Sequence, residues 1–300
     1  MLPQGFEDLV GDAALKQHKL GNQILDFLFA KNYQLVKPAM FEYMDQSDSK
    51  ELKQRNCFWF KDFISDSLLL IRDDVTKSLA RIVANMDHKN ELSLCYLEDV
   101  YIKKPDSLLK KRKYTQAGFE IITRNGLKSE IQIIENTVDL LAQLKSGNYQ
   151  FIFTFPNFFK EFIKSLKLDQ QQRESLLDIL RVKDLSRLQE LNLTDQKFIE
   201  KLVMICEPDI FLKNISALEI PALTKEILYI KDFLSSVSKY IDVGNVTIDL
   251  FDVAHFSYHR SFAFSVIADS TKGSLVKGGS YEVLENVPAV GASFYLENLL

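Results

Sequence analysis

The sequence is poor in the residues that mark secreted, metal-binding or membrane proteins. Only 3 of its 300 residues are cysteines, Cys57, Cys95 and Cys206, and their wide separation fits neither a disulfide framework nor a metal site. Its first residues hold no basic segment followed by an apolar one, so we expect no secretory signal. No apolar run approaches the roughly 20 residues of a membrane-spanning helix. These absences predict a soluble protein of the reducing cytoplasm.

An excess of positive charge is also missing. The formal net charge is −4 and no domain or tail is basic, whereas nucleic-acid binding needs a concentrated positive surface. We therefore expect no nucleic-acid partner. The one basic cluster comprises Lys103, Lys104 and the run Lys110–Lys113. It is either a solvated loop or a contact for a phosphate or an acidic partner.

Two β-rich segments flank this basic cluster. The residues of Cys95–Ile102 and Tyr114–Ile122 predict antiparallel strands joined by a long hairpin loop. In the second strand Gln116, Gly118 and Glu120 recur at period two, so they share one face of the sheet. The amide and the carboxylate can hydrogen-bond a small polar ligand, for which the glycine is expected to leave room.

The rest of the chain predicts helices around this hairpin. Apolar residues recur at helical spacing between Asp12 and Lys31, and almost throughout residues 157–241. Strands are predicted on both sides of the long helical stretch, at Tyr149–Thr154 and Phe262–Ala268. This order predicts an α+β fold: a single domain of residues 1–300, built on an antiparallel sheet flanked by helices, with a helical insertion at about 157–241.

The hairpin resembles motif 2 of the histidyl-tRNA synthetase group of class II synthetases, whose second strand ends in glutamine-x-glycine-x-glutamate. Here that ending is the run Gln116–Glu120. The run Arg72–Thr76 is similar to the arginine-proline-acid-x-threonine pattern of the same family, with Asp73 in the place of the proline. The resemblance implies that Asp74 and Thr76 hold the amino group of a bound amino acid. Alternatively, Asp74 only caps the following helix, for which Thr76 is itself a candidate N-cap.

Two segments near the end resemble the histidine-specific signatures of the family. In residues 252–261 the paired-tyrosine position reads Tyr258-His259, and the second signature reads Gly278–Glu282 and contains Tyr281. His259 is either a ligand contact or a hydrogen-bonded polar residue beneath the pocket. The resemblance therefore implies a histidine-binding set made of Asp74, Thr76, Gln116, Glu120, Tyr258, His259 and Tyr281.

The positions aligned with the catalytic arginines of the family carry other residues. They are Ile102 in motif 2, Ala254 in the first histidine signature and Asn298 in the segment that resembles motif 3. Activation of an amino acid by ATP needs cations to neutralise the carboxylate and the phosphate. The resemblance thus implies a ligand pocket without catalytic residues, metal or cofactor, and without the anticodon-binding domain of the synthetases.

A synthetase-like core of this kind is most similar to the regulatory subunits of ATP phosphoribosyltransferase. That resemblance implies a short-form catalytic subunit as partner, L-histidine as feedback effector in histidine biosynthesis, and a dimer within a hetero-oligomer. The dimer contact is expected in the segment before Glu42, which resembles motif 1. Two other functions remain open: a shortened synthetase-like ligase, and a tRNA- or protein-binding module that has no ligand.

Overall fold

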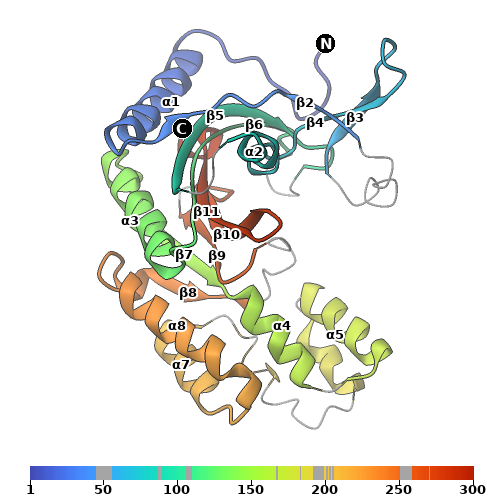
Figure 1. The fold of residues 1–300 in the computed structure, drawn as a ribbon, viewed down its shortest axis with the longest axis vertical. Helices are drawn as coiled ribbons and strands as arrows, with labels where there is room; N and C mark the ends of the chain where they lie inside the picture. Colours follow the sequence, from blue (N-terminus) through green and yellow to red (C-terminus); the bar gives the residue numbers. More distant parts are fainter. Residues whose placement is uncertain are drawn as a thin grey trace. The chain divides into compact units, whose positions relative to one another are not determined.

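The computed structural model of the chain is drawn in Figure 1. Two compact units make up the chain. The first comprises residues 1–124, 269–276 and 283–300, and the second comprises residues 125–268 and 277–282. The structure describes residues 1–44, 56–86, 90–105, 110–166, 168–182, 184–191, 199–200, 202, 204, 206–250, 259–269 and 271–300.

The first unit is built on strands in the order β1-β5-β6-β11. Strand β5 pairs with β6 in antiparallel register, with Tyr96 opposite Gly118, which confirms the predicted hairpin. Strand β11 pairs antiparallel with the other edge of β6. The two-residue strand β1 runs parallel to β5, so the sheet is mixed rather than purely antiparallel. The bounds are β1 Gln34–Leu35, β5 Leu92–Tyr101, β6 Lys113–Ile122 and β11 Val287–Tyr295.

Alternation along these strands gives the sheet an apolar face and a polar face. On the apolar face Phe119 packs against the edge of Tyr33, with ring centroids 5.5 Å apart. Helix α1, Asp12–Ala30, covers this face, and a Cβ at its Gly21 would lie only 2.9 Å from Leu97. Helix α2, Val75–Ala84, lies on the polar face, where its first turn reaches Glu120. Figure 1 shows both helices beside β5 and β6.

A second, smaller sheet lies in the first unit. Its strands have the order β2-β4-β3, and both pairs are antiparallel. The short helix α9, Leu296–Leu299, follows β11 directly. The bounds of the strands are β2 Phe41–Tyr43, β3 Phe58–Lys61 and β4 Leu68–Ile71.

The second unit carries strands in the order β10-β9-β7-β8, of which residues 277–282 of β10 belong to this unit. Its core is aromatic: Phe153 and Phe264 lie 6.2 Å apart, and both Phe153 and Phe262 contact Phe233 of helix α8. Strand β7 pairs antiparallel with β9 but parallel with β8. The bounds are β7 Tyr149–Thr154, β8 Val246–Ile248, β9 Ala263–Ala268 and β10 Val276–Leu284.

Helices fill most of the chain between β7 and β8, in the region where the sequence predicts a helical insertion. The description of residues 1–300 as one domain stays a prediction. In the described part of the second unit the helices include α3 Leu127–Gln143, α4 Pro156–Ser165, α5 Gln170–Val182, α7 Pro208–Ser216 and α8 Thr224–Val237, with 3₁₀ turns at Leu185–Leu191, Pro221–Leu223 and Val243–Asn245.

A carboxyl group is buried between two of these helices. Glu130 of α3 is 4% exposed, and the Tyr229 hydroxyl of α8 donates a 2.8 Å hydrogen bond to its Oε2. Burial raises the pKa of Glu130, against the smaller opposing effect of the hydroxyl. A raised pKa means that the folded protein holds the proton more tightly than the unfolded chain. Stability is therefore lost as the pH rises through the folded pKa.

Replacing this carboxyl by an amide removes its charged form. We expect Glu130→Gln to raise the free energy of unfolding at pH 8 by on the order of 1 kcal/mol, and to have a smaller effect at pH 4, where the acid is protonated. Urea unfolding at both pH values measures this, with the exposed Glu285→Gln as the control. An equal effect of Glu130→Gln at the two pH values would show that the charge is not the cause.

Candidate ligand site

Three strands bring polar side chains together on one face of the first unit's sheet. The register aligns residues of β5, β6 and β11 that point to the same side, the side covered by α2. This face contains the predicted strand residues of the site and others that the sequence analysis did not single out. Its rows are Leu94, Glu120 and Gly291; Tyr96, Gly118 and Ser293; and Glu98, Gln116 and Tyr295.

Glu120 lies on β6, the middle strand of this face, and is 1% exposed. Its Oε1 accepts a hydrogen bond of 3.0 Å from the Thr76 hydroxyl and one of 3.3 Å from the Tyr96 hydroxyl. Its other oxygen lies directly over Gly291, where any Cβ would overlap the carboxylate. The absence of a side chain at this position of β11 therefore leaves the space that the Glu120 carboxylate occupies.

Gly118 plays a different part from the one predicted. The expectation that it leaves room for a ligand is wrong, because the Tyr96 ring occupies the space above it and a Cβ there would overlap that ring. Tyr96 is fully buried, and its hydroxyl lies 2.7 Å from Ser293 Oγ. The glycine thus makes space for a tyrosine of the neighbouring strand, which then reaches Glu120.

Gln116 connects the sheet to the start of α2. Its Oε1 accepts a 3.2 Å hydrogen bond from the backbone N–H of Val75, and its Nε2 donates to the Tyr295 hydroxyl at 3.4 Å. The first N–H groups of a helix have no partner within the helix, so this glutamine satisfies one of them. Its amide oxygen is therefore already engaged before any ligand arrives.

Asp74, rather than Thr76, is the N-cap of α2. Its backbone is extended, and its Oδ1 accepts a 2.8 Å hydrogen bond from the backbone N–H of Thr76. The prediction that Thr76 is the cap is wrong, since Thr76 lies in the first turn and its hydroxyl faces Glu120. Burial raises the pKa of Asp74, more than Lys77 lowers it.

The carboxylates of Glu120 and Asp74 both affect the pKa of Tyr96. Burial, and then the charges of Glu120 and Asp74, raise the pKa of Tyr96 well above its usual range. Burial and the charge of Asp74 also raise the pKa of Tyr295. Both carboxylates are thus within electrostatic reach of one cluster of hydroxyl and amide groups. Such a cluster attracts a cation that carries several N–H donors.

Arg72 matches the family pattern but is bound within the protein. It is 5% exposed, and its guanidinium donates to the carbonyl oxygens of Pro38 and Asp99, both at 2.8 Å. Its remaining terminal nitrogen lies 2.6 Å from Glu98 Oε2. These bonds tie the end of β4 to β5, so the arginine has a structural task.

Two of the three positions aligned with the catalytic arginines are described. Ile102 forms an isolated antiparallel bridge with Cys57. Asn298 donates a 2.7 Å hydrogen bond from its Nδ2 to the backbone oxygen of Ser274. Ala254 lies outside the described residues. Neither described side chain is cationic.

The remaining predicted site residues belong to the second unit. His259 is 7% exposed, and its Nδ1 lies 3.1 Å from the backbone oxygen of Ser280. Burial lowers the pKa of His259 to about 4, so the ring is neutral at pH 7. The edge of its ring faces Tyr281, with centroids 6.5 Å apart. Tyr258 lies outside the described residues. A ligand role for these three residues stays a prediction.

The structure thus gathers Asp74, Thr76, Gln116 and Glu120 in the first unit, as predicted. The sequence analysis missed Tyr96, Ser293 and Tyr295, which complete the same cluster. The alternation of β5 and β11 is the signal that could have found them, but only once the register of the strands is known.

The described residues contain no group of three or more His, Cys, Asp or Glu side chains placed to hold a metal ion. Among the helices in the described part of the chain, none is long and apolar enough to cross a membrane.

Comparison with known proteins identifies the family. The sequence model described as Histidyl-tRNA synthetase matches residues 5–299, so the chain belongs to the histidyl-tRNA synthetase family. Two curated relatives are named ATP phosphoribosyltransferase regulatory subunit. The one from Nitrosospira multiformis is 27% identical over 99% of this chain and 80% of the relative. The one from Thermoanaerobacter sp. is 26% identical over 99% and 81%.

Solved structures share the fold. A Bacillus halodurans protein described as an ATP phosphoribosyltransferase regulatory subunit/histidyl-tRNA synthetase is 18% identical, with a TM-score of 0.86 over 100% of this chain and 82% of its own. A chain of the ATP phosphoribosyl transferase (HisG:HisZ) complex from Thermotoga maritima is 16% identical, with a TM-score of 0.73 over 93% and 97%. The chain therefore has the class II synthetase-like fold of these proteins.

The contact between Glu120 and Gly291 can be tested by adding one methyl group. We expect Gly291→Ala to lower the free energy of unfolding by about 1–3 kcal/mol, the usual cost of overpacking a filled interior. Chemical denaturation measures the loss. Gly244→Ala is the matched control, because a Cβ at Gly244 meets nothing within 4 Å. Equal stability of the two variants would contradict the described position of the carboxylate.

Proposed function

We propose that the chain is a non-catalytic regulatory subunit of ATP phosphoribosyltransferase, which binds free L-histidine and acts on a short-form catalytic subunit in the cytoplasm. The names of its curated relatives support this class of function. The observation that supports an amino-acid ligand is the pair of carboxylates, Asp74 and Glu120, that meet at Thr76: Asp74 accepts from its backbone N–H at 2.8 Å and Glu120 from its hydroxyl at 3.0 Å.

Histidine suits this cluster because it carries two kinds of N–H donor. Its ammonium group has three donors and needs an anion together with neutral acceptors. We assign Asp74 and the Thr76 hydroxyl to the ammonium, and Glu120 to the ammonium or to an imidazole N–H. Gln116 holds the start of α2 beside them. Tyr258, His259 and Tyr281 complete the predicted set from the other part of the sequence.

The alternative of a shortened ligase lacks cations at the positions where the family has them. Ile102, Ala254 and Asn298 stand there, and the Asn298 amide is already bonded to Ser274. Removing one donor to a developing oxyanion typically costs about 3–4 kcal/mol of barrier. With all three positions neutral, we infer that the chain does not form an adenylate.

Regulation by histidine requires two states of the assembly. A ligand shifts an equilibrium only by the difference in its affinity for the two states. We propose that histidine binds more tightly to the inhibited state of the complex than to the active one. Self-association of this subunit as a dimer within that complex is part of the proposal.

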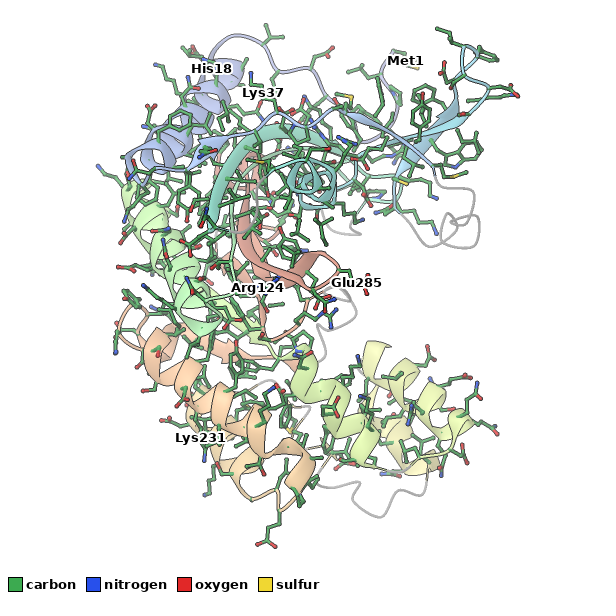
Figure 2. The ribbon with its side chains drawn as sticks, viewed as in Figure 1. Met1, His18, Lys37, Arg124, Lys231 and Glu285 are labelled. Carbon is green, nitrogen blue, oxygen red and sulfur yellow. The ribbon has the colours of Figure 1, made fainter. Side chains whose placement is uncertain are left out.

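Histidine binding depends on the two carboxylates in this proposal. We expect calorimetry to show binding of L-histidine to the chain, and both Asp74→Asn and Glu120→Gln to weaken it about 10-fold or more. A hydrogen bond to a charged group is worth about 1.5–3 kcal/mol, and 1.4 kcal/mol corresponds to a tenfold change. Glu285→Gln is the control, since this residue is exposed at the turn between β10 and β11 (Figure 2). No heat from the unaltered chain would refute a histidine site.

The role in the complex is tested with the partner present. We expect the chain to co-purify with a short-form phosphoribosyltransferase subunit, to raise its activity, and to make that activity sensitive to histidine. In a complex containing Glu120→Gln, the activity should persist at histidine concentrations that inhibit the unaltered complex. Histidine-dependent exchange of pyrophosphate into ATP by the chain alone would instead support the ligase.

A further inference from the structure

We propose that Tyr96 is a positioning residue of the histidine site, which holds the Glu120 carboxylate in the orientation that meets the ligand. This inference rests on the proposed function and assigns a task to a side chain outside the predicted binding set.

The space is created by a glycine on each side of the cluster. Gly118 lies opposite Tyr96 in the register, and the Tyr96 ring lies over it where a Cβ would overlap. Gly291 lies opposite Glu120 on β11 and leaves room for the carboxylate. The two glycines thus allow a large ring and a carboxylate to lie side by side against the backbone.

The hydroxyl of Tyr96 on β5 contacts both the Glu120 carboxylate on β6 and Ser293 on β11. It donates to Glu120 Oε1 at 3.3 Å and lies 2.7 Å from Ser293 Oγ. Because the phenol has only one proton, Ser293 must donate to Tyr96 when Tyr96 donates to Glu120. Thr76 donates to the same oxygen at 3.0 Å. One oxygen of the carboxylate is therefore held by two donors, and this fixes the rotation of the group.

The charges near Tyr96 determine its protonation state, and therefore its role as a hydrogen-bond donor. Tyr96 is fully buried and keeps its proton, since burial and the nearby carboxylates both disfavour the phenolate. A hydroxyl that stays protonated remains able to donate to Glu120. The other titratable groups on the described part of this face are Glu98, which is paired with Arg72, Asp74 at the N-cap of α2, and Tyr295 on β11. Such a donor fixes the orientation of the buried carboxylate before a cation binds to it.

Removing the hydroxyl alone tests this step. In Tyr96→Phe we expect the dissociation constant for L-histidine to rise about 10-fold, and the pH below which binding is lost to move upward, because a carboxylate without a donor takes up a proton more readily. The pH profile matters, since a merely structural loss would weaken binding equally at every pH. Tyr33→Phe is the matched control: a buried tyrosine packed against Phe119 on the apolar face.

Ser293→Ala is the second variant, because it keeps the ring that fills the space over Gly118. We expect a smaller weakening, about 3-fold, with the same upward movement of the pH profile. Unchanged affinity and an unchanged pH profile in either folded variant would overturn the role of Tyr96.

A readout without ligand separates this proposal from the proposed function. In the ligand-free protein, the carboxyl-carbon NMR signal of Glu120 should titrate at higher pH in Tyr96→Phe than in the unaltered chain. If the unaltered chain binds no histidine, the proposed function fails, and this titration still decides whether Tyr96 positions Glu120. An identical titration in both proteins overturns the inference.

Discussion

The register between β6 and its two neighbours is the constraint on which the rest of the first unit depends. On the polar face of the sheet, two glycines lie opposite large side chains: Gly118 opposite Tyr96, and Gly291 opposite Glu120. A slip by one residue would turn every side chain to the other face and would place a Cβ where the ring and the carboxylate now lie. The glycines therefore specify the pairing of the strands as much as the apolar pattern does.

The same register separates two tasks. On the apolar face Phe119 packs against Tyr33, and Gly21 of α1 lies close to Leu97, so apolar area is buried there. The polar face buries carboxyl, hydroxyl and amide groups, which cost free energy unless they are hydrogen-bonded. Such bonds are present here: Thr76 of α2 donates to Glu120, and Gln116 accepts from the backbone N–H of Val75 in α2. The Tyr96 hydroxyl bonds to Ser293 of β11. One face of the sheet thus buries apolar side chains against α1, while the other face holds the polar cluster beside α2.

Much of this could be predicted from the sequence because the signals are local. Period two placed Gln116, Gly118 and Glu120 on one face, and helical spacing predicted α1 almost to the residue. What failed depended on partners far along the chain. Glycine shows that space is needed but not for which side chain, and Tyr96 is identified only when β5 is laid beside β6. The cap of α2 could not be decided between Asp74 and Thr76, because both residue types are good caps, and the structure shows that it is Asp74. The parallel pairing of β1 was missed because two residues carry no directional signal.

A match to a family pattern also does not tell what a residue does. Arg72 fits the pattern, yet its guanidinium donates hydrogen bonds to Glu98 and to two backbone carbonyls. Asp74 fits it too, and one of its oxygens caps a helix while its charge still reaches two tyrosines. Both outcomes follow from how many partners the fold supplies. Each of the three guanidinium nitrogens of Arg72 donates to an acceptor, so this buried arginine joins segments of the first unit. The Asp74 carboxylate caps α2 and also lies in a cluster of acidic and hydroxyl groups. The partners that the fold supplies, more than the motif, therefore show what each of these two side chains does.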